Sequence, residues 1–138
     1  MPRSEELCRF WFQWFVAHPF KNMRPSFLDK LELDGYCTHH QLAFEYQGKQ
    51  HYHYMRHFHT TIEDFRKQIE RDQLKRMLCQ SHNVFLIEVP YLYNFRDTCS
   101  MSSFIFHQLR HAERVCGKRY IQRTSLLELK KKGVVQKW

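Results

Sequence analysis

The sequence lacks any apolar run of about 18 residues, the length that a membrane-spanning helix needs, so we expect no membrane segment. It also lacks the CxxC spacing by which paired cysteines mark a metal or redox site. The cysteines are odd in number and widely spaced: Cys8, Cys37, Cys79, Cys99 and Cys116. Such cysteines indicate reduced thiols in an intracellular protein of the nucleus or cytoplasm, and a viral origin stays open. Glu5 and Glu6 precede the first apolar stretch, which argues against a signal peptide.

Acidic residues are few beside basic ones, 14 against 22, and the net charge is +8. The excess is concentrated from Arg110 to Trp138, where nine lysines or arginines and two glutamates give +7. Such an asymmetry predicts a polyanion contact at the C-terminus, although a basic tail without a partner is the alternative. With 43% hydrophobic and 16% aromatic residues, a chain of 138 residues forms one domain with a real core. We therefore predict a domain over residues 1–117 and a basic C-terminal tail over 118–138.

Two segments alternate apolar and polar residues with the period of a strand, Leu31–Tyr36 and Leu42–Gln47. The link between them is short enough for a hairpin, which would bring Asp34, Glu45 and Gln47 onto one face. Two carboxylates at close range repel each other unless a cation lies between them. Hard divalent cations such as Mg²⁺ favour oxygen sites of this kind, whereas a solvated strand face with scattered charges is the alternative.

Other patterns complete a predicted α/β fold with a mixed central sheet of about four strands flanked by helices. Capping residues and apolar periodicity predict three helices, over residues 4–17, 61–80 and 104–115. A short first strand is expected over residues 20–27, with a bend at Pro25. A mostly apolar run over 84–89, ended by Pro90, predicts a buried strand parallel to its neighbour. Residues 94–103 are predicted to be a loop.

Several motifs in order resemble the PD-(D/E)XK nuclease superfamily, in its compact branch. They are Asp34-Gly35-Tyr36, Phe44-Glu45-Tyr46-Gln47-Gly48, Gln50-His51-Tyr52, Arg71-Asp72-Gln73-Leu74-Lys75 and Leu86-Ile87-Glu88-Val89-Pro90-Tyr91, with similar segments at 4–9 and 24–28. The resemblance covers residues 4–93 and implies a restriction-endonuclease-like core and a metal-dependent endonuclease acting on DNA. Gln47 departs from the family, which usually has lysine at that position.

The resemblance implies a site in which Asp34, Glu45 and the backbone carbonyl of Tyr46 hold Mg²⁺ or Mn²⁺. An acid from the first helix often joins such a site, and we assign Glu6 to it, with Glu5 as the alternative. Gln47 has no charge, and its expected role is to orient the attacking water. Residues expected to bind the nucleic acid are Lys49, Gln50, His51, Arg56, Lys75, Lys130, Lys131 and Lys132.

Three alternatives stay open. Lys75 either replaces the missing strand lysine or forms a surface ion pair with Asp72, three residues away on the same helix. The chain is either an active nuclease or a binding module that has lost cleavage, which Gln47 favours. His53 and His57 have the spacing of zinc ligands, which would fit a small structural zinc protein. The other interpretations of this segment are rings that stack on nucleic-acid bases and plain packing over the sheet. The aromatic residues are also compatible with a homodimer.

Overall fold

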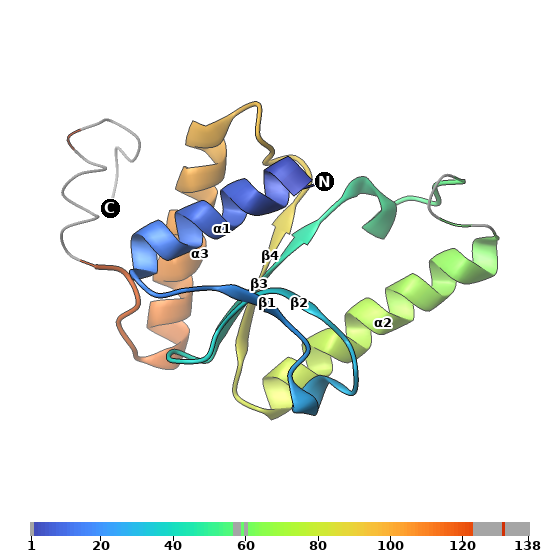
Figure 1. Cartoon of the computed structure of the whole chain (residues 1–138), viewed down its shortest axis with the longest axis horizontal. Coiled ribbons are helices and arrows are strands. Elements are labelled where there is room, and N and C mark those ends of the chain that lie inside the picture. Colours follow the sequence, from blue (N-terminus) through green and yellow to red (C-terminus); the bar gives the residue numbers. More distant parts are fainter. Residues whose placement is uncertain (1, 57–58, 60, 123–130, 132–138) are drawn as a thin grey trace.

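The computed structural model describes the whole chain except residues 1, 57–58, 60, 123–130 and 132–138 (Figure 1). Its helices are α1 (Pro2–Val16), α2 (Ile62–Ser81) and α3 (Thr98–Cys116), and its strands are β1 (Lys21–Met23), β2 (Leu33–Cys37), β3 (Leu42–Gln47) and β4 (Phe85–Pro90). Two short 3₁₀ helices, η1 (Ser26–Leu28) and η2 (Lys49–His51), follow β1 and β3. In the described residues no helix is long and apolar enough to cross a membrane.

The four strands form one mixed sheet in the order β1-β2-β3-β4. The first three strands pair antiparallel, and β4 pairs parallel with β3 after the chain has passed through α2. Helices α1 and α3 lie on one side of the sheet and α2 lies on the other (Figure 1). The predicted α/β class, mixed sheet of four strands and flanking helices are therefore confirmed.

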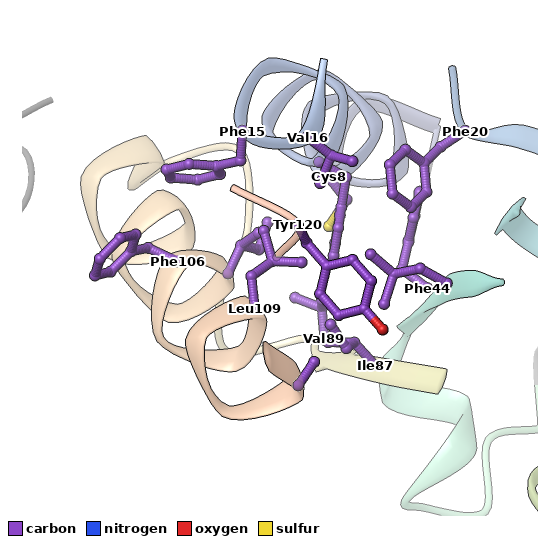
Figure 2. Close-up of a cluster of buried hydrophobic side chains, with 14 of the residues drawn as sticks. Cys8, Phe15, Val16, Phe20, Phe44, Ile87, Val89, Phe106, Leu109 and Tyr120 are labelled. Carbon is purple, nitrogen blue, oxygen red and sulfur yellow. The ribbon is translucent and has the colours of Figure 1, made fainter. Parts of the chain in front are cut away.

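The larger core lies between the sheet and helices α1 and α3 (Figure 2). Its centre is aromatic: the rings of Phe12 and Phe44 stack at 4.7 Å, and Phe20 packs against both. Gly35 makes room for this stack, because a Cβ at that position would stand 2.0 Å from a Phe44 ring carbon. A smaller core lies under α2 and η1, around Leu33 and Cys79. Both faces of the sheet are thus covered, as a parallel β3–β4 pair requires.

Helix α2 begins where the sequence predicted it. Thr61 is its N-cap and accepts a hydrogen bond from the Asp64 N–H, while the Asp64 side chain accepts from the Thr61 N–H. This reciprocal capping box satisfies two main-chain donors that have no partner inside the helix. The cap fixes the start of the helix that carries Asp72 and Lys75.

Helix α3 corrects the prediction of a loop over residues 94–103. The helix begins at Thr98, because Asp97 caps it by accepting hydrogen bonds from the Ser100 N–H and hydroxyl. Hydroxyl residues such as Thr98 and Ser100 favour turns, so the sequence predicted a loop here. In the structure they occupy the first turn of the helix. Gly117 ends the helix at φ 65°, as its position after the last apolar residue predicted.

The first strand is also shorter than predicted, covering Lys21–Met23 before the chain turns into η1. Beyond α3, Tyr120 and Ile121 are buried in the larger core although the sequence assigned them to the basic tail. The Glu113 side chain accepts hydrogen bonds from the N–H groups of both residues. The described core therefore extends to residue 121.

Candidate functional site

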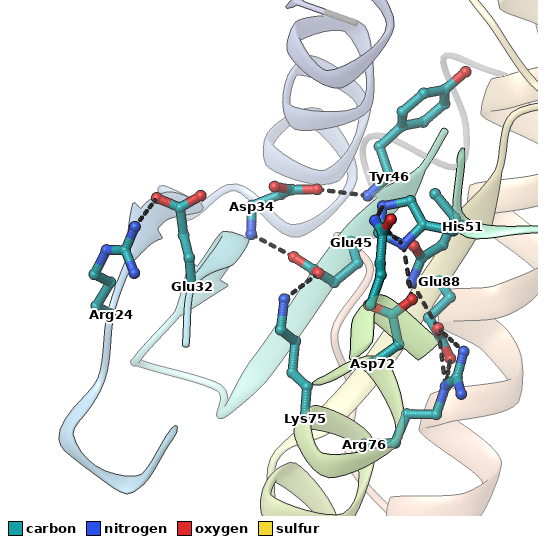
Figure 3. Close-up of polar contacts among 12 residues, drawn as sticks. Arg24, Glu32, Asp34, Glu45, Tyr46, His51, Asp72, Lys75, Arg76 and Glu88 are labelled. Carbon is teal, nitrogen blue, oxygen red and sulfur yellow. Dashed lines mark hydrogen bonds and ion pairs between the residues drawn. The ribbon is translucent and has the colours of Figure 1, made fainter. Parts of the chain in front are cut away.

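The two predicted carboxylates lie where strands β2 and β3 separate. Regular pairing of the strands runs from Cys37 to Gly35 and stops there. Beyond it, the Asp34 N–H donates to Glu45 Oε2 at 2.7 Å, and the Tyr46 N–H donates to Asp34 Oδ2 at 2.8 Å (Figure 3). Side chains thus replace main-chain carbonyls as acceptors, and both carboxylates are locked at the open end of the hairpin.

Lys75 reaches this pair from helix α2. Its Nζ lies 2.6 Å from Glu45 Oε1, and both side chains are largely buried (Figure 3). The predicted surface pair between Lys75 and Asp72 is not what the geometry favours, because a carboxylate oxygen of Asp72 lies 2.8 Å from His51 Nδ1 instead. Of the two alternatives for Lys75, the structure has the side chain directed into the site.

The site holds more negative charge than Lys75 balances. Burial, followed by the charge of Glu45, raises the pKa of Asp34 to about 7, and Glu5 adds to the rise. Burial also raises the pKa of Glu45, although Lys75 opposes the rise by charge and by its hydrogen bond. Both carboxyls therefore hold protons more tightly than usual, because burial and neighbouring negative charge disfavour the ionised form.

These residues line a pocket of about 240 Å³. Its lining is Glu5, Glu32, Asp34, Glu45, Tyr46, Gly48, His51 and Lys75. The acid from α1 that reaches the pocket is Glu5, the alternative of the sequence analysis, whereas Glu6 is exposed and is not part of the lining. The oxygen donors of Asp34, Glu45 and Glu5 fit a hard divalent cation better than they fit zinc.

Arg9 is a residue of the site that the sequence analysis missed. Its guanidinium donates to the main-chain carbonyls of Phe20 and Asp34, and it forms an ion pair with Glu5 at 3.4 Å. It also lies over the Phe44 ring at 5.8 Å. Arg9 thereby ties α1 to the strand that carries Asp34, a link between residues 25 positions apart that no local pattern signals.

Gln47 does not join the two carboxylates, although it shares their strand face. Its amide donates to Glu88 Oε1 on β4 at 2.7 Å, and Glu88 is held in turn by the guanidinium of Arg76 through contacts of 2.8–3.0 Å. Gln47 is 3% exposed, and its Oε1 is buried without a partner in the described part of the chain. The expected role in orienting water is therefore not supported by where the side chain points.

His51 belongs to a chain of polar contacts that runs away from the pocket. His51 Nδ1 forms a hydrogen bond with Asp72 Oδ2. The Gln68 amide nitrogen lies 3.3 and 3.4 Å from the two ring nitrogens of His51. Gln68 Oε1 contacts Nε2 of buried His59, whose Nδ1 accepts from the Met55 N–H at 3.0 Å. That acceptor role puts the proton of His59 on Nε2 and orients the Gln68 amide toward His51.

The structure describes only some of the remaining residues predicted to bind nucleic acid. Lys49, Arg56 and Lys131 are exposed. Gln50 lies in η2, but its side chain falls outside the described part of the structure. Lys130, Lys132 and His57, the partner of His53 in the zinc reading, lie outside the described residues altogether.

Comparison with known proteins finds viral relatives. The chain is 36% identical over 115 residues to "Uncharacterized protein 033L" of Invertebrate iridescent virus 3, covering 79% of this chain and 58% of the relative. It is 45% identical over 84 residues to "Uncharacterized protein 307L" of Invertebrate iridescent virus 6, covering 53% and 43%. It is 53% identical over 62 residues to "Uncharacterized protein 094L" of Frog virus 3 (isolate Goorha), covering 44% and 40%.

The chain thus spans about half the length of the curated relatives it matches. No family model matches the chain. No solved structure matches it either. All three relatives are viral proteins, which supports a viral origin.

Proposed function

We propose that the chain is a metal-dependent endonuclease that hydrolyses phosphodiester bonds in DNA, with the sheet forming a restriction-endonuclease-like core. The observation that carries the proposal is the pair Asp34 and Glu45, locked side by side at the open end of a hairpin and facing a pocket. The motif order of the PD-(D/E)XK superfamily adds support, because its resemblance puts the same two acids at the metal site.

The donors of the pocket suit Mg²⁺ or Mn²⁺. Asp34 and Glu45 would hold the ion, with Glu5 and the Tyr46 carbonyl as further oxygen donors from the pocket lining. A bound divalent cation would supply positive charge for the scissile phosphate and would make a water molecule more acidic.

Lys75 takes the role that the missing strand lysine leaves open. Its ammonium contacts Glu45 Oε1 in a largely buried position, so it favours the ionised form of Glu45 against the effect of burial and presents a positive charge beside the pocket. That charge would attract the phosphate and stabilise the negative charge that develops on it. Gln47 contributes indirectly in this scheme, by holding Glu88 beside Arg76.

The proposed substrate is a nucleic acid for two reasons. The chain is basic, and Lys75 presents a positive charge beside the pocket, and both features suit a polyanion. Lys49 and Arg56 are exposed in the segment that follows β3, close in sequence to the pocket residues Gly48 and His51. They would contact the phosphate backbone, together with the cations of the C-terminal segment. DNA is the substrate that the resemblance implies.

A second candidate function is a nuclease-fold module that binds nucleic acid without cutting it. Two observations favour it: Lys75 already neutralises Glu45, and Gln47 stands where the family usually has lysine. In that case the ion pair would replace the metal and stabilise the fold.

One experiment separates the two functions. Tag-free protein is incubated with supercoiled plasmid and with duplex, single-stranded, forked and junction DNA, with Mg²⁺, with Mn²⁺ or with EDTA. We expect metal-dependent cleavage that Asp34→Asn and Glu45→Gln each reduce by at least about 100-fold, a loss of roughly 3 kcal/mol of transition-state stabilisation. Glu63→Gln, an exposed acid on α2 paired with Arg66, is the matched control and should cleave like the parent.

The outcomes are distinct. Asp34→Asn keeps an oxygen for the Tyr46 N–H, so its folding and DNA affinity should be preserved. Glu45→Gln keeps one oxygen for the Asp34 N–H but loses the charge that pairs with Lys75, so its melting temperature is measured beside its cleavage. Cleavage at the parent rate by either variant would remove the proposed site. Salt-dependent binding without cleavage of any substrate would establish the binding module instead.

A further inference from the structure

Three histidines meet at the opposite end of β2 from Asp34. His18 follows the end of α1, while His39 and His40 lie in the turn between β2 and β3. A ligand nitrogen of each ring lies within 4.8 Å of the other two. The His18 and His39 rings stack at 4.1 Å, and the His40 ring stands edge-on to both, at 5.0 and 4.6 Å.

The surroundings hold two of these rings in place. Burial raises the pKa of the Cys37 thiol, and the N–H groups of His40 and His39 point at its sulfur and offset part of the rise. The buried Tyr120 ring packs edge-on against His40 at 5.3 Å.

Besides His18 and His39, Lys118 lies near enough to act on the His40 ring by its charge. Neutral imidazole is the form that binds a metal ion. Lys118 also repels a bound cation, but it is exposed, so solvent screens its charge.

We propose that His18, His39 and His40 bind one Zn²⁺ ion, with water as the fourth ligand. Three histidines leaving one open position is an established ligand set for zinc, with Zn–N distances of about 2.0–2.1 Å. Tetrahedral geometry at that bond length puts ligand nitrogens about 3.4 Å apart, so the stacked rings of His18 and His39 must turn apart for their lone pairs to meet at one ion. His39 is exposed and on a turn, which makes such rotation easy.

The site is separate from the proposed nuclease centre and from the histidines of the segment after β3. It joins the end of α1 to the β2–β3 turn, so bound zinc would stabilise the folded state against the unfolded chain. The proposal does not depend on nuclease activity.

The test uses metal-free, tag-free protein under reducing conditions. Zn²⁺ is titrated in the presence of a competing chelator, and bound zinc is measured by elemental analysis after dialysis. We expect one zinc per chain, an increase of the melting temperature with zinc, and a visible absorption spectrum typical of tetrahedral Co²⁺ after cobalt substitution. The double variant Asp34→Asn/Glu45→Gln should keep all three.

Ligand variants make the assignment specific. His39→Ala changes an exposed side chain, so the protein should fold. Its zinc affinity should fall at least about 100-fold, because one of the three protein ligands is lost. His40→Ala should do the same. His107→Ala, an exposed histidine on α3, and Cys99→Ser/Cys116→Ser, which removes the exposed thiols, should keep full binding.

The proposal is overturned by any of three results. The parent protein binds less than stoichiometric zinc at micromolar metal; His39→Ala binds zinc as the parent does; or binding disappears in the exposed-thiol variant.

Discussion

At the scale of single residues, the ionised form of Asp34 lowers the free energy of unfolding. Asp34 keeps its proton up to about pH 7 in the folded protein, because burial and Glu45 raise its pKa from 3.8. The folded state therefore binds more protons than the unfolded chain between these values. The contribution of Asp34 to the free energy of unfolding must fall as pH rises from about 4 to about 7 and stay low above it.

The prediction concerns metal-free protein and the variant Asp34→Asn. The asparagine side chain would keep the acceptor for the Tyr46 N–H but lack the charge that repels Glu45. In EDTA at pH 8 the variant should melt at least about 3 °C above the parent, and the difference should shrink toward pH 5. Thermal melts across this range give the measurement. A difference independent of pH would show that charge repulsion is not the cause.

Lys75 carries a second prediction at this scale. Lys75→Met removes the partner of a buried carboxylate, and breaking such a pair costs about 3–5 kcal/mol of folding free energy. Because Glu45 can then take up a proton, the loss should be smaller at pH 5 than at pH 8. Chemical denaturation at both values measures it, with Lys67→Met on the same helix as the control. An equal loss at both pH values would contradict the assignment of the pair.

At the scale of elements, the hairpin depends on the absence of a side chain at Gly35. A Cβ there would overlap the Phe44 ring, which is stacked on Phe12 and cannot yield freely. Gly35→Ala should cost about 1–3 kcal/mol and should also weaken divalent-cation binding, since Gly35 is the last paired residue before Asp34. Gly117→Ala, which has open space but a positive φ, should cost about 1 kcal/mol and leave cation binding unchanged. Denaturation and calorimetric titration of both variants provide the comparison, and equal cation affinity in the two would refute the coupling.

Local patterns in the sequence were enough to predict most elements and the meeting of Asp34 with Glu45. Alternation in the two strands placed these acids on one face, and Thr61 marked the start of α2. The partner of Gln47 could not be predicted in the same way. It depends on the register of the parallel pair β3–β4, which puts Glu45 opposite Glu88 and is set by tertiary packing.

Contacts between helices and strands that are distant in the sequence were also hard to predict: Arg9 was missed, and for Lys75 the sequence left two alternatives open. Arg9 reaches the Asp34 carbonyl across 25 positions, and Lys75 reaches Glu45 across 30. Both depend on how α1 and α2 pack on the sheet, and a basic residue on an amphipathic helix gives no signal of which acid it will meet. The sequence could not decide between Glu5 and Glu6 for the same reason, because which of them reaches the pocket depends on the rotation of α1 about its axis.

At the scale of the whole molecule, the basic C-terminal segment can be separated from the described core. Truncation after Gln122 keeps Tyr120 and Ile121, which are buried, and removes Lys130, Lys131 and Lys132. For duplex DNA, the slope of log K against log salt should fall by about 0.9 for every phosphate that the shortened chain no longer binds, so three such phosphates would change it clearly. Cleavage at saturating DNA should persist. A truncated protein that melts like the parent and has an unchanged salt slope would exclude a role for the segment in binding.

The edge position of β4 affects whether copies of the protein can pair strand to strand. In the described part of the chain, β4 pairs with β3 on one side only, so its other edge offers main-chain groups to a strand from another molecule. Its sequence, FLIEVP, is apolar enough to promote such cross-β association. Glu88 in its middle introduces a charge, and Pro90 at its end lacks an N–H to donate. The carboxylate that receives Gln47 and Arg76 thus also puts a negative charge on the strand with the open edge, which disfavours pairing with a strand of another molecule.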